Sequence, residues 1–305
     1  MKKLNIVIII ILSLIILGSA SYLIYVNLKA RKEIESSVVL RNLVVKDIEE
    51  VETKETKQTE ANSKNYTDFI DKYLKRKIDF AALKQRNKNV DQWLYYPETK
   101  FDFPVVMEPE VNEYYYDMIG FDGFWTGAGT PLIPKSPGER DFRTLILAHR
   151  MIDYWGEDDY FFSNLPKRWM DKENASKHKY VYTYKDNKAY RWQIWTGMPL
   201  RGDDFIYQTP FEKGSKDYQN LLDHVKSNAN YTIGEAPSNL TPTLMLSTCS
   251  RYADNVNVGR YVAIFQLDLE YDQETGHLKY FKDEANEEFW KELNEHDRKG
   301  ELRDE

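Results

Sequence analysis

The chain has 305 residues and a formal net charge of −7, and apolar residues make up 42% of it. This length suffices for one or two domains with a substantial core, and the mild acidity argues against nucleic acid as the main partner. Aromatic residues reach 14%, a level that favours β-rich structure. The single cysteine, Cys249, excludes an internal disulfide bond.

The N-terminal residues 4–26 form an apolar run without a single charge. About 20 apolar residues span a bilayer, and the run exceeds the roughly 7–15 residues of a signal-peptide core. Small residues at 18–21 imitate a cleavage site, but apolar residues resume after them. We therefore expect an uncleaved membrane anchor in residues 1–28. Basic residues flank the run on both sides, so charge alone leaves its orientation open.

Residues 29–65 are rich in charge and poor in aromatics. This composition predicts a stalk that is partly helical or disordered. From Tyr66 onward the texture changes, and apolar residues recur at helical spacing. One or two short entry helices are therefore expected at the start of a folded domain that covers residues 66–272. The charged residues 273–305 are predicted to form a C-terminal tail.

Between residues 93 and 271 the sequence predicts strands separated by turns. "FDFPVVM" contains Pro104, which places it at a sheet edge or at a strand start. "FRTLILAHR" is a continuous apolar run, typical of a strand buried on both faces. "KYVYTYKDNKAYRWQIWTGM" predicts a hairpin with Asp186 and Asn187 at its turn.

One clear helix interrupts the strands, in "SKDYQNLLDHVKSNANYT". Its apolar side chains repeat at i, i+3, i+4 and i+7, and Ser215 is placed to cap its N-terminus. The apolar positions are Tyr218, Leu221, Leu222 and Val225. The strands "TLMLSTC" and "RYVAIFQLDLEY" follow. Many short strands with few helices predict a mainly β fold, either a barrel or a sandwich.

Cys249 ends an apolar strand, and composition alone would make it a small buried hydrophobe. A nucleophilic cysteine needs a proton-exchanging partner, a positive group and exposure at the end of a rigid element. His149 also ends an apolar strand, and two strand ends can meet at one edge of a barrel. The remaining histidines are predicted to be solvated: His178, His224, His277 and His296.

Two arginines follow the cysteine and could supply the positive charge. Arg251 lies in a loop rich in Asp and Asn, whereas Arg260 opens the next strand. A strand holds its residues in place through its ladder of hydrogen bonds, so we favour Arg260 over Arg251.

The order of these motifs resembles that of the sortases, and in particular class B. The resemblance rests on "LSTC" at Cys249, "LILAHRM" at His149, the strand-opening Arg260, "DFAALKQRNKNVDQWLYYPETKFDFPVV", "NEYY" and the helix "YQNLLDHVKS", and covers about residues 66–271. It implies a closed sortase-type β-barrel of about eight strands, with N-terminal helices and one helix before the cysteine strand. One departure is Met245, where the family usually has threonine, and it puts substrate detail in doubt.

By this resemblance the chain is a membrane-anchored cysteine transpeptidase of Gram-positive bacteria. Cys249 would attack a C-terminal sorting signal of a secreted protein, and His149 would exchange protons with the leaving and entering amines. Arg260 would stabilise the oxyanion, and Ser247 and Thr248 would contribute to substrate binding. The acceptor would be an amine of a peptidoglycan crossbridge or lipid II. No cofactor, metal or nucleic acid is implied, and the domain would lie outside the cell with the N-terminus inside.

The same residues allow other interpretations. The acceptor could be a lysine of another pilin, which would make the chain a class B-type pilin polymerase. The "RGD" at residues 201–203 invites a non-enzymatic surface-binding protein, although a turn explains it as well. A papain-like hydrolase would place its cysteine before its histidine, at a helix N-terminus. The acidic residues 153–160 lack the spacing of a known calcium loop.

Overall fold

The computed structural model describes residues 2–46, 72–97, 99–109, 115–134, 142–150, 161–207, 211–249 and 259–280. Its helices are α1 (Lys2–Val44), η1 (Lys72–Lys75), α3 (Phe80–Arg86), α4 (Tyr115–Met118), α5 (Leu165–Trp169), α6 (Lys172–Lys177), η2 (Phe205–Tyr207) and α7 (Lys216–Asn228). Its strands are β1 (Val45–Lys46), β2 (Lys77–Ile78), β3 (Val90–Tyr95), β4 (Asp102–Met107), β5 (Leu132–Ile133), β6 (Arg143–Leu147), β7 (Tyr180–Lys185), β8 (Lys188–Arg201), β9 (Thr243–Cys249), β10 (Gly259–Asp272) and β11 (Leu278–Tyr280).

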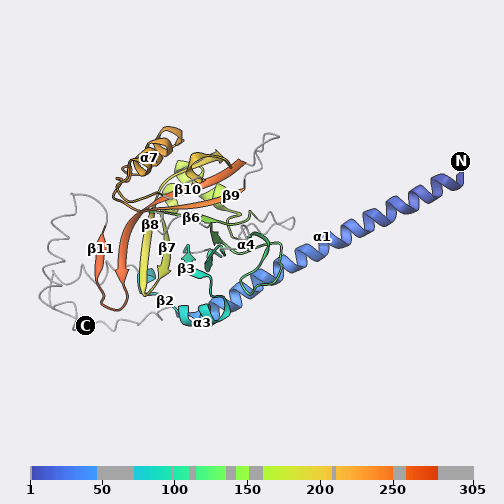
Figure 1. The fold of residues 1–305 in the computed structure, drawn as a ribbon, viewed down its shortest axis with the longest axis horizontal. Helices are drawn as coiled ribbons and strands as arrows, with labels where there is room; N and C mark the ends of the chain where they lie inside the picture. The colour runs from blue at the N-terminus through green and yellow to red at the C-terminus, as the bar shows by residue number, and fades with distance from the viewer. Residues whose placement is uncertain are drawn as a thin grey trace, which may run out of the picture.

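The large sheet closes into a barrel, as the sequence predicted (Figure 1). Its strands run in the order β10-β8-β7-β3-β4-β5-β6-β9, and β9 pairs back onto β10 to complete a ring of eight. The pairs β4–β5 and β6–β9 are parallel, whereas the remaining pairs of the ring are antiparallel. The ninth strand, β11, pairs only with the second half of β10, which β9 does not reach.

Local sequence signals explain two elements of the fold. Asp186 and Asn187 both adopt positive φ angles, 49° and 61°, and these form the primed turn that two-residue hairpins favour. The α7 helix begins at Ser215, whose hydroxyl accepts a hydrogen bond from the Tyr218 backbone N–H at 3.0 Å. The four predicted apolar positions of α7 are all buried. Both predictions are confirmed.

Pro104 lies where β4 has a sheet partner on only one side. It faces Trp93 of β3, whereas β5 pairs with β4 only at Val106 and Met107. The start of β4 is therefore a local edge inside a closed barrel, and a residue without an N–H is tolerated there.

The side chains of β9 alternate between two hydrophobic clusters. Leu244 and Leu246 join the cluster to which most barrel strands contribute, which also contains Trp169 of α5. Met245 points the other way and packs in the cluster that contains the buried face of α7. Met245, the departure from the family pattern, is thus fully buried beneath α7. Cys249, the last residue of β9, follows Met245 by four positions, so its side chain points to the same face of the strand.

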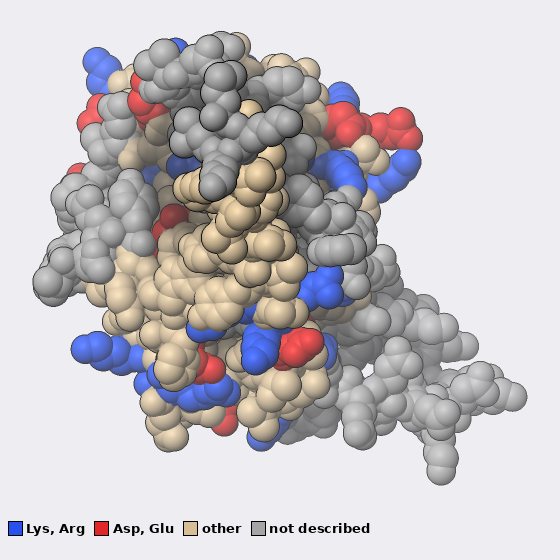
Figure 2. Space-filling view, turned by 90° about the vertical axis from the view of Figure 1, so that its right-hand side faces the viewer, with Lys and Arg blue, Asp and Glu red and all other residues tan. Residues whose placement is uncertain are grey.

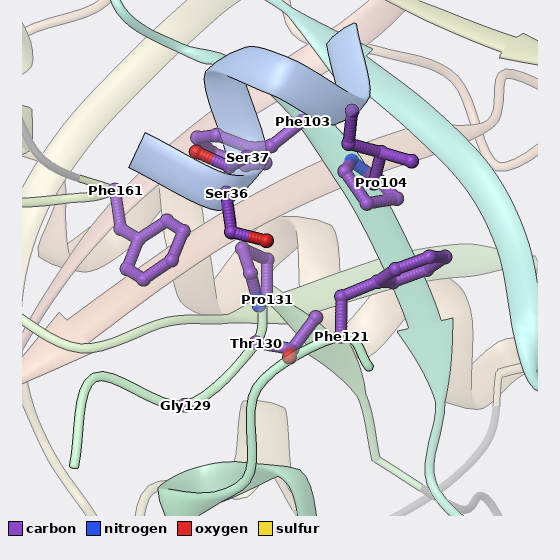
Figure 3. A pocket seen from close by; sticks show the side chains of 10 residues that line it. Ser36, Ser37, Phe103, Pro104, Phe121, Gly129, Thr130, Pro131 and Phe161 are labelled. Atoms are coloured by element: carbon purple, nitrogen blue, oxygen red, sulfur yellow. The ribbon is translucent and has the colours of Figure 1, made fainter. Parts of the chain in front are cut away.

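The N-terminal helix continues well beyond the predicted anchor. It runs without a break to Val44, and its last turns lie against the domain, where Leu40 and Val44 are buried among residues of η1, α3 and β3 (Figure 1). A shallow pocket, with about 280 Å³ of empty space partly open to solvent, remains between α1 and the barrel. Figure 3 shows Ser36 and Ser37 of α1 facing Phe121, Pro131 and Phe161 across it.

Candidate active site

The register of the barrel determines where Cys249 lies. β9 is flanked by β6 on one side and by β10 on the other, and Cys249 is its last residue. In the antiparallel ladder, Cys249 pairs directly with Arg260 at the start of β10. Paired residues of neighbouring strands project to the same face of a sheet. The thiol and the guanidinium therefore share one face at one edge of the barrel.

Arg260 and Cys249 are in direct contact. An Nη1 nitrogen of the guanidinium donates to the Sγ atom of Cys249, which is a free cysteine of intermediate exposure. The positive charge lies where it stabilises a thiolate, or a negative oxygen that develops next to it.

His149 follows β6, the strand that pairs with β9 in parallel. Leu147 pairs with Ser247, so the same register continued by two residues places His149 beside Cys249. Two hydrogen bonds hold these strand ends together beyond the ladder. The Ala148 N–H donates to the Ser247 carbonyl at 3.2 Å, and the Thr248 hydroxyl donates to the Ala148 carbonyl at 2.7 Å.

The imidazole of His149 is turned toward α4. Its Nε2 lies 2.7 Å from the backbone oxygen of Asp117 and 3.3 Å from the Oδ1 atom of the same residue. A carbonyl oxygen only accepts, so Nε2 carries the proton in this contact and Nδ1 is left for other proton exchange. A hydrogen bond to a carbonyl fixes the ring orientation and the tautomer, which is a role that an orienting group plays for a catalytic base.

Ser247 and Thr248 are both buried, and their hydroxyl groups are engaged within the protein. The Thr248 hydroxyl holds the end of β6, as described above, and the Ser247 Oγ shares a 2.9 Å hydrogen bond with the Tyr207 hydroxyl. Their predicted contact with substrate stays a prediction.

Sequence reasoning missed Tyr207. This residue ends η2, and burial raises its pKa well above the usual range, whereas the hydrogen bond with Ser247 and the charge of Arg260 act in the opposite direction. Its phenol therefore stays protonated beside the arginine. One tyrosine among 22 carries no sequence signal that would single it out.

Other predicted features divide into those that the structure describes and those that it does not. Arg251, His296 and the acidic residues 153–160 lie outside the described residues. Arg201 of the RGD tripeptide forms an exposed ion pair with Asp203 at the end of β8, in a turn. His224 was predicted to be solvated, but its ring is half-buried and its Nε2 lies 3.0 Å from Asp204. The apolar stripe of α7 did not reveal this partner because Asp204 belongs to another segment.

Comparison with known proteins agrees with this geometry. No protein-family model matches the chain. Sortase B of Listeria monocytogenes is 22% identical over 177 residues, which are 58% of this chain and 69% of that protein. Among solved structures, a Staphylococcus aureus sortase B–substrate complex matches with a TM-score of 0.52 and 20% identity, covering 62% of this chain and 83% of its own. Clostridium perfringens sortase B matches with a TM-score of 0.53 and 20% identity, covering 62% and 99%.

These relatives share the barrel that carries Cys249, His149 and Arg260. The fold prediction made from the motif order is correct. The chain has the sortase fold, and its resemblance to class B sortases is confirmed.

Proposed function

We propose that the chain is a cysteine transpeptidase that cleaves a sorting signal of secreted proteins and transfers the acyl group to an amine. The observation that carries this proposal is the contact between Arg260 and Cys249 at the barrel edge, with His149 at the end of the adjoining strand. Nucleophile, positive group and proton carrier thus come from three neighbouring strands. The relationship to sortase B supports the same reaction class.

The reaction has two acyl-transfer steps. Cys249 attacks a peptide carbonyl as the thiolate, after its thiol proton has passed to His149. A C–S bond forms, the C–N bond breaks, and the leaving amine takes that proton from His149. The entering amine then attacks the thioester, gives a proton to His149, and releases Cys249. In both steps Arg260 donates hydrogen bonds to the developing oxyanion, a task that suits its fixed fork of donors.

The N-terminal helix supports a location at the membrane. Within the described residues, one segment, Asn5–Lys29 of α1, is long and apolar enough to cross a bilayer, and none of it is buried in the protein. A signal sequence has a similar composition. We propose that the segment is retained as an anchor, with the N-terminus inside the cell and the barrel outside, where secreted substrates are found.

The acceptor that we propose is an amine of a peptidoglycan crossbridge or of lipid II, so that the product is a protein fixed to the cell wall. A pilin lysine is the alternative acceptor, and it uses the same acyl-enzyme.

A conjugation assay tests the function. The detergent-solubilised full chain is incubated with a panel of sorting-signal peptides and with either a glycine peptide or a lysine-bearing peptide as the amine. Mass spectrometry should detect a peptide–amine conjugate that Cys249→Ala abolishes, and the preferred amine distinguishes the two acceptors. Failure to form any conjugate across the panel would favour a non-enzymatic surface-binding protein instead.

A further inference from the structure

The α1 helix joins the membrane-crossing segment to the barrel without a hinge. The span ends at Lys29, yet the helix continues to Val44 and already lies against the domain at Val26. At about 1.5 Å per residue, the part from Val26 to Val44 extends about 27 Å along the domain. The inference below rests on the proposed role of this helix as a membrane anchor.

The far end of α1 is fastened to the barrel by a buried charge cluster. Arg41 of α1 contacts the carboxylate of Asp102, which also accepts two hydrogen bonds from Arg76 at 2.8 and 2.7 Å. The indole N–H of Trp93 donates to the same carboxylate at 2.7 Å. Groups from three other chain segments therefore converge on one side chain, and the Val44 carbonyl accepts from the Asp79 N–H at 2.9 Å just beyond it. The direction of α1 relative to the barrel is fixed.

A tight turn of the domain lies beside the outer end of the span. Ile119 bridges to Trp125, and the Gly120 N–H donates to the Phe124 carbonyl at 2.8 Å. A Cβ atom on Gly127 would lie 3.4 Å from the Cγ1 atom of Val26, so this turn packs directly on α1 where the apolar run ends. We call residues 119–127 the interface turn.

The interface turn presents an apolar side chain to its surroundings. Phe124 is 73% exposed, the highest value for any large apolar residue described outside α1, and Met118 beside the turn is also exposed. On α1, Tyr22 and Tyr25 are exposed close to the same level. The basic residues Lys29, Arg31 and Lys32 follow on the helix, and Figure 2 shows Lys and Arg side chains around α1 on the face from which it projects.

Aromatic side chains gather at the boundary between hydrocarbon and water, and basic side chains are attracted by anionic lipid headgroups just outside it. We propose that the interface turn is a second membrane contact, with Phe124 and Trp125 in the interfacial layer of the bilayer next to α1. The barrel then rests on the membrane in one orientation instead of moving on a loose tether.

This contact would set the height of the active site above the bilayer. The turn is joined to α4 by the hydrogen bond from Thr126 N–H to the Met118 carbonyl, at 3.0 Å. Within α4, Asp117 holds His149. Two hydrogen bonds, Thr126 to Met118 and His149 to Asp117, therefore connect the interface turn to His149. An acceptor carried on a lipid would be presented at that membrane surface.

Depth-dependent fluorescence quenching tests the proposal on the full chain. In a Cys249→Ala background, single cysteines replace Phe124, Tyr22 or Leu240, and each is labelled with an environment-sensitive thiol probe. The proteins are reconstituted into vesicles of neutral and anionic phospholipid that carry a spin label near the headgroup. Leu240 is the matched control, because it is 59% exposed but precedes β9 and lies outside the interface turn.

The expected result is a loss of fluorescence at position 124 close to that at position 22, with little loss at position 240. Quenching at 22 without quenching at 124 would overturn the interface contact while leaving the anchor intact. Absence of quenching at both positions would overturn the anchor and the contact together. A labelled Phe124→Cys protein with a melting temperature equal to that of Leu240→Cys shows that the substitution has not unfolded the domain.

Discussion

Two features determine where the Cys249 side chain lies: the alternation of side chains along β9 and the pairing of Cys249 with Arg260. The strand alternates between the cluster inside the barrel and the cluster under α7, and the thiol falls on the second face, at the point where the ladder ends. A lone cysteine with such neighbours differs from an ordinary buried one because a charged donor is in contact with it.

Gly129 tests the importance of the carbonyl that holds His149. A Cβ atom on Gly129 would lie 2.3 Å from the Asp117 backbone oxygen, so Gly129→Ala must displace the group that orients the imidazole. Gly123 is the matched control. It also has a positive φ, 84° against 68°, but a Cβ atom there meets nothing within 4 Å.

Both alanine variants carry the same kind of backbone strain, of about 1 kcal/mol or more. We expect Gly129→Ala to lower kcat/KM of the conjugation reaction by at least about tenfold beyond Gly123→Ala, as misplacement of a catalytic group by about 1 Å does. Steady-state kinetics alongside thermal melting would measure this. Equal rates for the two variants would mean that Asp117 does not position His149.

Arg260→Lys separates charge from geometry. Lysine keeps the positive charge but loses the fork of donors. Removal of one oxyanion donor typically lowers kcat by about 10²–10³-fold, and we expect a loss of about that size with little change in melting temperature. Arg86→Lys, in an exposed ion pair on α3, is the control and should leave kcat unchanged. A fully active Arg260→Lys variant would contradict the proposed role of the guanidinium.

At the scale of elements, those that depend on neighbouring residues in the sequence could be predicted from it. The hairpin turn and the α7 helix follow from residues within a few positions of each other, and both were predicted correctly. The sequence did not predict β11, which falls in the segment expected to be a charged tail. Its three residues form a strand by pairing with β10, and no local pattern indicates that pairing. The pairing of His149 with Asp117, and of Ser247 with Tyr207, joins distant segments, and no local pattern encodes such contacts.

Asp102 is the carboxylate that joins α1 to the buried Arg76. Asp102→Asn would leave Arg76 and Arg41 against a neutral amide in a buried position, and breaking a buried ion pair in this way costs about 3–5 kcal/mol. Asp122→Asn is the comparison, because its ion pair with Arg86 is exposed and is worth about 0–1 kcal/mol. Chemical denaturation of the solubilised protein would measure both. A similar small loss for the two variants would show that Asp102 does not fasten α1.

At the scale of the whole molecule, an uninterrupted α1 connects the membrane span to a closed barrel. Composition predicted a partly helical or disordered stalk after residue 28, and the structure describes helix as far as Val44. The high charge of residues 29–65 taken as a whole hid this continuity. Leu40 and Val44, which face the barrel one helical turn apart, lie in a short apolar stretch inside that charged segment.

The proposed orientation can be checked with the only thiol of the chain. In intact cells that produce the protein, a membrane-impermeant maleimide should label Cys249, because the barrel would lie outside the membrane. Labelling only after the cells are permeabilised would reverse the topology. The Cys249→Ala chain is the control for reagent that reacts elsewhere.

The central claim is that Cys249 forms an acyl-enzyme with a sorting signal. The intact mass of the full chain, measured after mixing with sorting-signal peptides in the absence of an added amine, tests this directly. We predict a mass increase equal to the N-terminal part of one peptide, located on Cys249, removed by hydroxylamine and absent in Cys249→Ala. Peptide cleavage or amine conjugation that persists in Cys249→Ala would contradict the account.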